Sequence, residues 1–178
     1  MSRDLDLLFA GFGGQGVLFA GKLVAYAGLV EGRELSWLPS YGPEMRGGTA
    51  NCSVCLSDEP IGSPQVVQPD VLVAMNQPSL DKFFADVVPG GVVIVDSGLV
   101  PNVPERDDVR IFRIPATAMA EEAGLKGLGN VILVGKVFAE TGFCERESLY
   151  AAIRKSVSAK RQNLVEANVK AIEIGMGS

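Results

Sequence analysis

The stretch formed by residues 40–48 holds the side chains best suited to bind a charged ligand. Tyr41 offers a hydroxyl, Glu44 a carboxylate, and Arg46 a planar guanidinium that matches the geometry of a carboxylate or phosphate. The glycines and the proline among them impose a shape on the backbone, which orients these groups. The sequence predicts a binding loop here, with a Glu44–Arg46 structural ion pair or a plain solvated loop as alternatives. The candidate binding residues are Ser40, Tyr41, Glu44, Arg46, Gly47 and Gly48.

A second glycine-rich stretch, residues 11–16, has the G-x-G-x-x-G pattern between a buried strand and a helix. Glycines let the backbone approach a phosphate, and a helix N-terminus favours an anion. A dinucleotide site also needs an acid after the second strand; there is none, and Glu31 and Glu34 precede that strand. We therefore expect contact with a phosphate, another part of a cofactor or a partner chain, or a tight turn that serves packing alone. The candidate residues are Gly11, Gly13, Gly14, Gln15 and Gly16.

Length and composition limit the class of protein. One domain over residues 1–178 is expected, because 47% of the residues are hydrophobic and the chain is long enough for a core. The net charge of −5 argues against nucleic acid or an anionic membrane as a partner. No apolar run is long enough for a membrane span, and no signal peptide is expected at the start of the chain. Three cysteines are too few for a disulfide framework, which favours the cytoplasm.

Histidine is absent, which removes Ser-His-Asp and Cys-His nucleophilic systems and the commonest ligand of zinc and haem. Any chemistry near neutral pH is therefore expected to rest on the shape of a site rather than on a general base. Cys52 and Cys55 form a C-x-x-C pair, but residues three apart on a strand point to opposite faces. We expect no metal site from them or from the isolated Cys144, and read all three as buried small hydrophobes.

The hydrophobic pattern predicts strands that alternate with helices over the first two-thirds of the chain. The expected strands are 5–10, 35–38, 49–56, 71–75, 92–95 and 109–114. The expected helices are 17–30, 78–85, 116–123, 131–141, 145–157 and 163–174. The connection between the second and third strands is too short for a parallel crossover, so these two strands should pair antiparallel. The predicted fold class is α/β, with three α/β/α layers around a mixed, mostly parallel sheet.

Polar side chains follow two of the predicted strands. Asn76 and Gln77 come after the fourth strand, and Asp96 and Ser97 close the fifth. Because ligands of open α/β sheets bind at the carboxyl ends of the strands, these residues join the candidates. Near the end of the chain, a solvated basic face on the last helix is expected from Lys155, Lys160, Arg161 and Lys170.

Three motifs follow one another along the chain. They are Gly11-Phe12-Gly13-Gly14-Gln15-Gly16-Val17, Ser40-Tyr41-Gly42-Pro43-Glu44-Met45-Arg46-Gly47-Gly48 and Ser57-Asp58-Glu59-Pro60-Ile61-Gly62-Ser63-Pro64. In this order they resemble the gamma subunit of 2-oxoacid:ferredoxin (acceptor) oxidoreductases, and the equivalent domain of single-chain pyruvate enzymes. The resemblance covers almost the whole chain. Indolepyruvate oxidoreductase beta subunits are similar at the first motif only, which favours the pyruvate, 2-oxoglutarate or branched-chain branch.

The resemblance implies a complex that decarboxylates a 2-oxoacid on thiamine diphosphate, sends electrons through iron–sulfur clusters to ferredoxin, and passes the acyl group to coenzyme A. Alpha and beta subunits and a ferredoxin-like delta subunit would hold thiamine diphosphate and the clusters, and this chain would be inactive alone. It would contribute to the coenzyme A site or to subunit contacts through the two glycine-rich stretches. In that role Arg46 would face a phosphate or a partner's acid, with Glu44 orienting it and Gln15 adding an amide contact.

Two functions from other classes stay open at this point. One is a stand-alone dinucleotide-binding reductase, which would bind NAD(P)H or FAD tightly. The other is a purely structural scaffold subunit, in which the two stretches would only hold partner chains together. A homodimer of the isolated chain is a further option.

Overall fold

The computed structural model describes residues 4–41, 49–157 and 159–178. Six strands form one sheet in the order β2-β3-β1-β4-β5-β6. The strands are β1 (Leu5–Phe12), β2 (Glu34–Tyr41), β3 (Thr49–Ser57), β4 (Val71–Ala74), β5 (Val92–Asp96) and β6 (Arg110–Ile114). Strands β1, β4, β5 and β6 run parallel, whereas β3 is antiparallel to both β1 and β2. The predicted mixed sheet and its antiparallel pair are confirmed.

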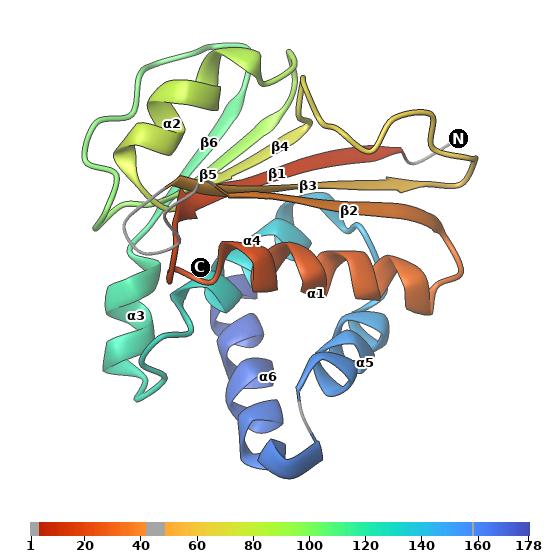
Figure 1. The fold of residues 1–178 in the computed structure, drawn as a ribbon. Helices are drawn as coiled ribbons and strands as arrows, with labels where there is room; N and C mark the ends of the chain where they lie inside the picture. Colours follow the sequence, from red (N-terminus) through yellow and green to blue (C-terminus); the bar gives the residue numbers. More distant parts are fainter. Residues whose placement is uncertain (1–3, 42–48, 158) are drawn as a thin grey trace.

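Helices cover both faces of this sheet (Figure 1). Helix α2 (Gln77–Phe83) and the 3-10 turn η1 (Phe84–Asp86) lie on one face. The other face carries the remaining helices, which are α1 (Val17–Val30), α3 (Ala116–Glu122), α4 (Gly129–Thr141), α5 (Arg146–Ser156), η2 (Ala159–Arg161) and α6 (Gln162–Met176). The predicted three layers are confirmed. In the part of the chain that the structure describes, no helix combines the length and the apolar character needed to cross a bilayer.

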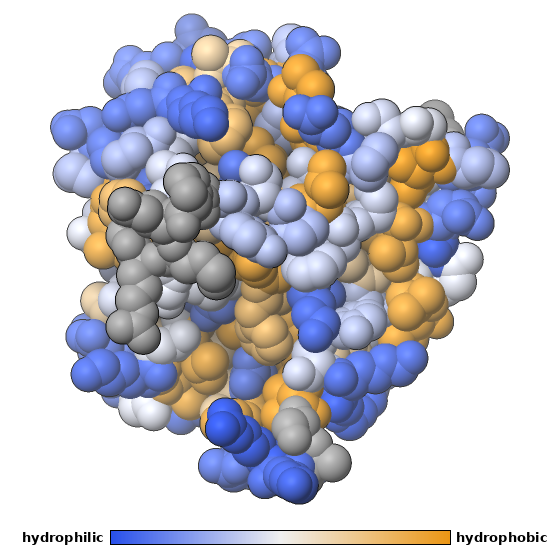
Figure 2. Space-filling model, viewed as in Figure 1, coloured by the Kyte–Doolittle hydropathy of each residue, from blue (hydrophilic) through white to orange (hydrophobic). Residues whose placement is uncertain are grey.

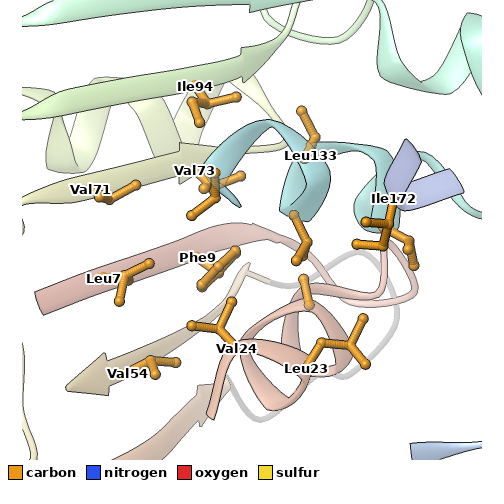
Figure 3. Packing of buried hydrophobic residues seen from close by; sticks show 14 of the residues in the cluster. Leu7, Phe9, Leu23, Val24, Val54, Val71, Val73, Ile94, Leu133 and Ile172 are labelled. Atoms are coloured by element: carbon orange, nitrogen blue, oxygen red, sulfur yellow. The ribbon is translucent and has the colours of Figure 1, made fainter. Parts of the chain in front are cut away.

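Strand alternation divides the core into two hydrophobic clusters, one on each face of the sheet. Leu7 and Phe9 of β1 belong to the cluster on the α1 face of the sheet, which also contains Val73 of β4 and Leu133 of α4 (Figure 3). Leu8, between them, belongs to the cluster under α2. Burying a side chain of this size contributes roughly 1.5–3 kcal/mol, so the register of β1 is fixed from both faces.

The same alternation separates the two cysteines of the C-x-x-C pair. Cys52 packs in the cluster with α1 and Cys55 in the cluster under α2, so their side chains point to opposite faces as predicted. Burial raises the pKa of the Cys52 thiol to about 12 and that of Cys55 to about 11. Both thiols therefore stay protonated near neutral pH, as small hydrophobic side chains do.

Helices α4 and α6 cross with their backbones in contact. A Cβ added at Gly175 would collide with the carbonyl oxygen of Ile132, and one added at Gly135 would collide with that of Ile172. Only glycine permits this approach, so the pair fixes where α4 lies. The point matters because α4 begins at the carboxyl edge of the sheet.

The predicted basic residues are exposed, and η2, which holds two of them, lies at the end of the molecule farthest from the sheet (Figure 1). Lys155 is in α5, Lys160 and Arg161 are in η2, and Lys170 is in α6. Figure 2 shows a hydrophilic surface at this lower end, where α6 begins. The expected solvated face is confirmed, although it is spread over three elements rather than one helix.

Candidate functional site

The first glycine-rich stretch forms a tight turn between β1 and α1. Gly14 and Gly16 have φ of +92° and +74°, which favours glycine. The Gln15 side chain closes the turn: its Oε1 accepts a hydrogen bond from Phe12 N–H at 2.6 Å, and its Nε2 donates to Met75 O at 2.8 Å. Gln15 thus joins the carboxyl ends of β1 and β4. Its predicted contact with a ligand stays a prediction.

Two glycines of this turn also allow close packing. A Cβ at Gly11 would lie 2.6 Å from Gln15 Oε1, and one at Gly16 would collide with the side-chain amide of Asn130. Asn130 lies at the start of α4 and donates from Nδ2 to Gly16 O at 3.0 Å. Close packing therefore explains why glycine occurs at both ends of the pattern. This agrees with one of the alternatives in the sequence analysis, a tight turn that serves packing.

The second stretch is only partly described. Strand β2 continues to Tyr41, so Ser40 and Tyr41 belong to a strand; the expectation that this strand ends at Leu38 is wrong. Pro39 made a longer strand look unfavourable in the sequence, because proline cannot donate a hydrogen bond in a sheet. However, β2 is an edge strand, and edge strands tolerate proline. Glu44, Arg46, Gly47 and Gly48 lie outside the described residues, so their predicted roles stay predictions.

An apolar cavity of about 300 Å³ brings the two stretches together. It is lined on one side by Gly13, Gly14 and Gly16, and on the other by Tyr41 and Thr49, the residues on either side of 42–48. Leu18 and Phe19 of α1 complete its apolar wall. Helix α1 opens onto it without a side-chain cap, and its first turn holds no acid. The N-terminus of α1 therefore presents its positive end here.

Alternation along β2 separates the neighbouring candidate Ser40 from this cavity. Ser40 lines a different hollow on the α2 face of the sheet, together with Leu38 and Asn51. Tyr41, one residue later, points to the α1 face and is 55% exposed. The two sequence-predicted residues are thus on opposite sides of the sheet.

A second, smaller cavity of about 120 Å³ lies on the other side of Gly14, which lines both. It is lined by Gln15, Met75, Asp96, Thr117, Gly129 and Asn130, with Leu99, Ala120 and Leu133 as apolar wall. Asp96 is 2% exposed; its Oδ2 accepts from Thr117 N at 3.0 Å and Thr117 Oγ1 at 2.6 Å, and its Oδ1 accepts from Gly98 N at 3.1 Å. The predicted candidate Asp96 thus lies at a cavity.

The other predicted candidates at strand ends have structural partners. Asn76 caps α2, with its Oδ1 accepting from Ser79 N at 2.8 Å. Gln77 donates to Asp81 and to the Asn102 carbonyl at the surface. Sequence reasoning missed Thr117, Gly129 and Asn130, which line the polar cavity. The one available signal was their place at or just before the start of predicted helices, which is where free N–H groups occur.

Both cavities lie at the point of the sheet where the helices that follow two adjacent parallel strands go to opposite faces. Helix α1 follows β1 to one face of the sheet, and α2 follows the neighbouring parallel strand β4 to the other. Such a switch point is the usual ligand position of an open α/β sheet. Fold and site together define an α/β domain with two adjoining cavities at the carboxyl edge of its sheet.

The chain belongs to the pyruvate ferredoxin/flavodoxin oxidoreductase family, whose sequence model matches residues 6–178. It is 44% identical to the ketoisovalerate oxidoreductase subunit VorA of Methanothermobacter marburgensis over 97% of this chain, but spans only 36% of that relative's length. It is 40% identical to the 2-oxoglutarate synthase subunit KorC of Methanocaldococcus jannaschii, over 85% of this chain and 83% of the relative.

Solved structures agree with this assignment. The keto/oxoacid ferredoxin oxidoreductase gamma subunit from Geobacter sulfurreducens has a TM-score of 0.83 at 31% identity, over 97% of this chain and 96% of that one. The 2-oxoglutarate:ferredoxin oxidoreductase from Magnetococcus marinus shares the fold, with a TM-score of 0.87 at 22% identity over 98% of this chain and 30% of that one. That structure contains bound 2-oxoglutarate, coenzyme A and succinyl-CoA.

Proposed function

We propose that this chain is the gamma subunit of a 2-oxoacid:ferredoxin oxidoreductase complex, which oxidatively decarboxylates a 2-oxoacid to an acyl-CoA. Membership of the family and the match over almost all of a gamma subunit support this. The alpha and beta subunits would hold thiamine diphosphate and a ferredoxin-like delta subunit would hold iron–sulfur clusters, with ferredoxin as acceptor. We place the complex in the cytoplasm, because the three cysteines are free and buried.

The division of labour rests on the side chains that this chain offers. Within residues 4–41, 49–157 and 159–178, no three acids or thiols gather closely enough to hold a metal ion. Cys52, Cys55 and Cys144 lie apart, and burial raises the pKa of each thiol, whereas cluster ligands are thiolates. The clusters therefore suit a partner better than this chain.

The role of this subunit is to bind part of coenzyme A at the carboxyl edge of its sheet. One observation carries this proposal: the apolar cavity joins the uncapped N-terminus of α1 to the two ends of the second glycine-rich stretch. The free N–H groups of a helix N-terminus bind anions, and the apolar wall suits the uncharged remainder of a cofactor. Bound coenzyme A supplies the thiol that accepts the acyl group. Gly13, Gly14 and Gly16 would position the part of coenzyme A that this subunit binds. Arg46 is the proposed contact for a phosphate of coenzyme A.

Reconstitution tests the function directly. The isolated chain should give no coenzyme-A-dependent reduction of a viologen dye with pyruvate, 2-oxoglutarate or branched-chain 2-oxoacids. Addition of the alpha, beta and delta subunits should restore it with one of these substrates. Turnover by the isolated chain would contradict the proposal.

Two variants separate a coenzyme A site from a scaffold. Arg46→Ala should raise the KM for coenzyme A about tenfold or more, because a charge-assisted contact contributes roughly 1.5–3 kcal/mol. Arg161→Ala, at the exposed tip far from both cavities, is the matched control and should leave the KM unchanged. A scaffold subunit would instead show weaker assembly of Arg46→Ala with an unchanged KM. Tight NAD(P)H or FAD binding by the isolated chain would favour a reductase.

A further inference from the structure

A hollow of about 540 Å³ lies on the α2 face of the sheet, between α2 and the edge strand β2. Helix α2 packs on β1 and β4, so the part of this face formed by β2 and β3 lies beyond it. Leu8, Ser53 and Val66 form the buried floor of the hollow, and Ser53 Oγ accepts from Val66 N at 3.1 Å. The floor is closed, and the hollow has room for several side chains of another molecule.

Three polar side chains around the hollow are accessible and unused. Ser40 of β2 and Gln65 are exposed, and Asn51 of β3 is partly buried. Their side-chain groups make no hydrogen bond to any other residue that the structure describes. A hydroxyl and an amide side chain each donate and accept. These groups can therefore bond to another molecule without losing an internal hydrogen bond.

Lys82 is the one charged side chain in the described lining of the hollow. Its Nζ lies 5.0 Å from the centre of the Phe83 ring, and it makes no ion pair with the residues that the structure describes. The neighbouring carboxylate, that of Asp81, accepts from Gln77 Nε2 at 2.8 Å and does not line the hollow. A single cation among hydroxyl and amide groups complements a carboxylate.

Exposed apolar side chains gather on the strand at the rim of the hollow. Seven large apolar side chains are exposed in the described part of the chain, and three of them, Trp37, Leu38 and Tyr41, belong to the eight residues of β2. Leu38 lines the hollow and is 39% exposed. Such a concentration is typical of a surface that another protein covers. A small ligand inside the hollow would leave the rest of β2 exposed.

Pro39 argues against a partner that adds a strand to β2. Ala10 O accepts from Met75 N on the β4 side, so the backbone of the preceding Phe9 points to β3. Phe9 pairs with Cys52, and Cys52 pairs with Pro39, so Pro39 directs its backbone to the open edge. Proline has no N–H, which interrupts the row of donors that an added strand needs. A partner would therefore bind beside β2 through its side chains.

We propose that this hollow is the docking site for an acidic segment of a partner subunit. A carboxylate of that segment pairs with Lys82, and an apolar side chain next to it packs on Leu38 and Phe83. Asn51 and Gln65 bond to the polar groups of the segment. This proposal rests on the proposed function, which supplies the alpha, beta and delta subunits as partners. Because β2 continues to Tyr41 at the apolar cavity, a subunit docked here lies next to the proposed coenzyme A site.

Carbodiimide crosslinking of the assembled complex tests the docking site. This reagent joins a lysine to a carboxylate only when the two are in contact. Mass spectrometry should find Lys82 joined to an aspartate or glutamate of the alpha, beta or delta subunit. Crosslinks from other lysines of this chain without any from Lys82 would overturn the proposal. A crosslink from Lys82 to a second copy of this chain would also overturn it.

Two variants with matched controls measure the contribution of the hollow. Lys82→Glu should weaken assembly about tenfold or more, because two like charges then meet in the interface. Leu38→Asp should have a similar effect, since it places a carboxylate beside that of the partner. Lys155→Glu on α5 and Leu29→Asp on α1 alter exposed residues outside the hollow and should leave the affinity unchanged. Equal losses in variants and controls would overturn the proposal.

Charge exchange distinguishes an ion pair from a loss of folding. Once crosslinking identifies the acid of the partner, its replacement by lysine should restore most of the affinity lost in Lys82→Glu. Absence of any recovery would overturn the pairing with Lys82. Circular dichroism of Lys82→Glu should match that of the unaltered chain, because the side chain is exposed.

The same complexes separate this proposal from the proposed function. At saturating subunit concentrations, Lys82→Glu should leave the KM for coenzyme A unchanged. Normal assembly of Lys82→Glu in an active complex would overturn the docking site and leave the proposed function in place. Failure of the unaltered chain to assemble with any of the three subunits would overturn both.

Discussion

Helices α1 and α4 begin side by side, and the difference between their starting points explains the site. Both start at the carboxyl edge of the sheet without a side-chain cap, and a hydrogen bond from Asn130 to Gly16 O links them. The start of α1 opens onto an apolar cavity, and the start of α4 onto a polar one with a carboxylate. Free N–H groups of the same kind, at the starts of two helices, therefore face two different environments.

This contrast teaches that a helix N-terminus alone does not choose its ligand. The partial positive charge is similar in both helices, so the lining decides. The described lining of the cavity at α1 holds no acid, whereas Asp96 lies in the lining of the cavity at α4. The following predictions alter the residues that separate or line the two cavities.

Gly16→Ala should have the largest effect, because it disturbs both helix starts at once. A left-handed conformation costs an alanine about 1–2 kcal/mol, and the new Cβ displaces Asn130 from its hydrogen bond, for roughly 1 kcal/mol more. We expect a loss of about 2–3 kcal/mol in unfolding free energy, measured by urea denaturation. The control is Gly32→Ala, which has φ of +71° and open space around it. Equal losses in both would show that Asn130 contributes nothing.

Gln15→Ala should cost about 2 kcal/mol of stability, because it leaves Phe12 N–H and Met75 O without their shared partner. The link between the ends of β1 and β4 would be lost, and the polar cavity would lose part of its wall. Gln77→Ala removes similar bonds at the surface, where water replaces them, and should cost less than about 1 kcal/mol. Thermal unfolding of both variants measures the difference, and the reverse ranking would contradict our account of Gln15.

Tyr41→Ala affects only the apolar cavity. The ring is 55% exposed, so stability should change by less than about 0.5 kcal/mol. Loss of an aromatic wall should weaken coenzyme A binding by about three- to tenfold, measured by calorimetry. Leu29→Ala removes an apolar side chain that is 49% exposed and outside both cavities. A loss of affinity in Leu29→Ala, or none in Tyr41→Ala, would argue against the apolar cavity as the binding site.

Alkaline pH reports on the layer beneath the apolar cavity. Cys52 Sγ donates to Val17 O at 3.6 Å, and burial raises the pKa of this thiol from 9.0 to about 12. Because the folded-state value is the higher one, this stability is fully present below pH 9 and is lost as pH rises towards about 12. Near pH 10 the loss should be roughly 1 kcal/mol per buried thiol.

Cys52→Ser should flatten part of this alkaline decline, measured by urea denaturation over a pH series. A serine hydroxyl does not ionise in this range, so residue 52 no longer contributes to the pH dependence of the unfolding free energy. Cys55→Ser, on the opposite face of the sheet, is the matched variant, with a thiol pKa of about 11. An unchanged pH profile in both would contradict the burial of these thiols.

Most of the scaffold could be predicted from the sequence, because local periodicity and turn chemistry determine it. The buried run before Gly11 predicted β1, and helical spacing predicted α1 with the same bounds as observed, Val17–Val30. The short connection after β2 correctly predicted an antiparallel pair. Helix α4 begins at Gly129 rather than at residue 131, because glycine and asparagine are weak helix formers, although the first turn of a helix accepts them.

The site was predictable only where it depends on local sequence. Gly13, Gly14 and Gly16 of the first stretch and Tyr41 were candidates, and they line the apolar cavity. The contact of Asn130 with Gly16 has no local signal, because it forms only through the packing of α4, 114 residues further along the chain. The need for glycine at position 16 follows from that distant contact, so the pattern was visible in the sequence but its cause was not.

The glycine-to-glycine crossing of α4 and α6 has a consequence for binding kinetics. Because the backbones touch at Gly135 and Gly175, α4 cannot slide or roll without separating from α6. The N–H groups at the start of α4 are therefore preorganised before any ligand arrives. Association should then proceed without a slow rearrangement step, and the middle of α4 should be among the last segments of this chain to exchange its amide protons with deuterium.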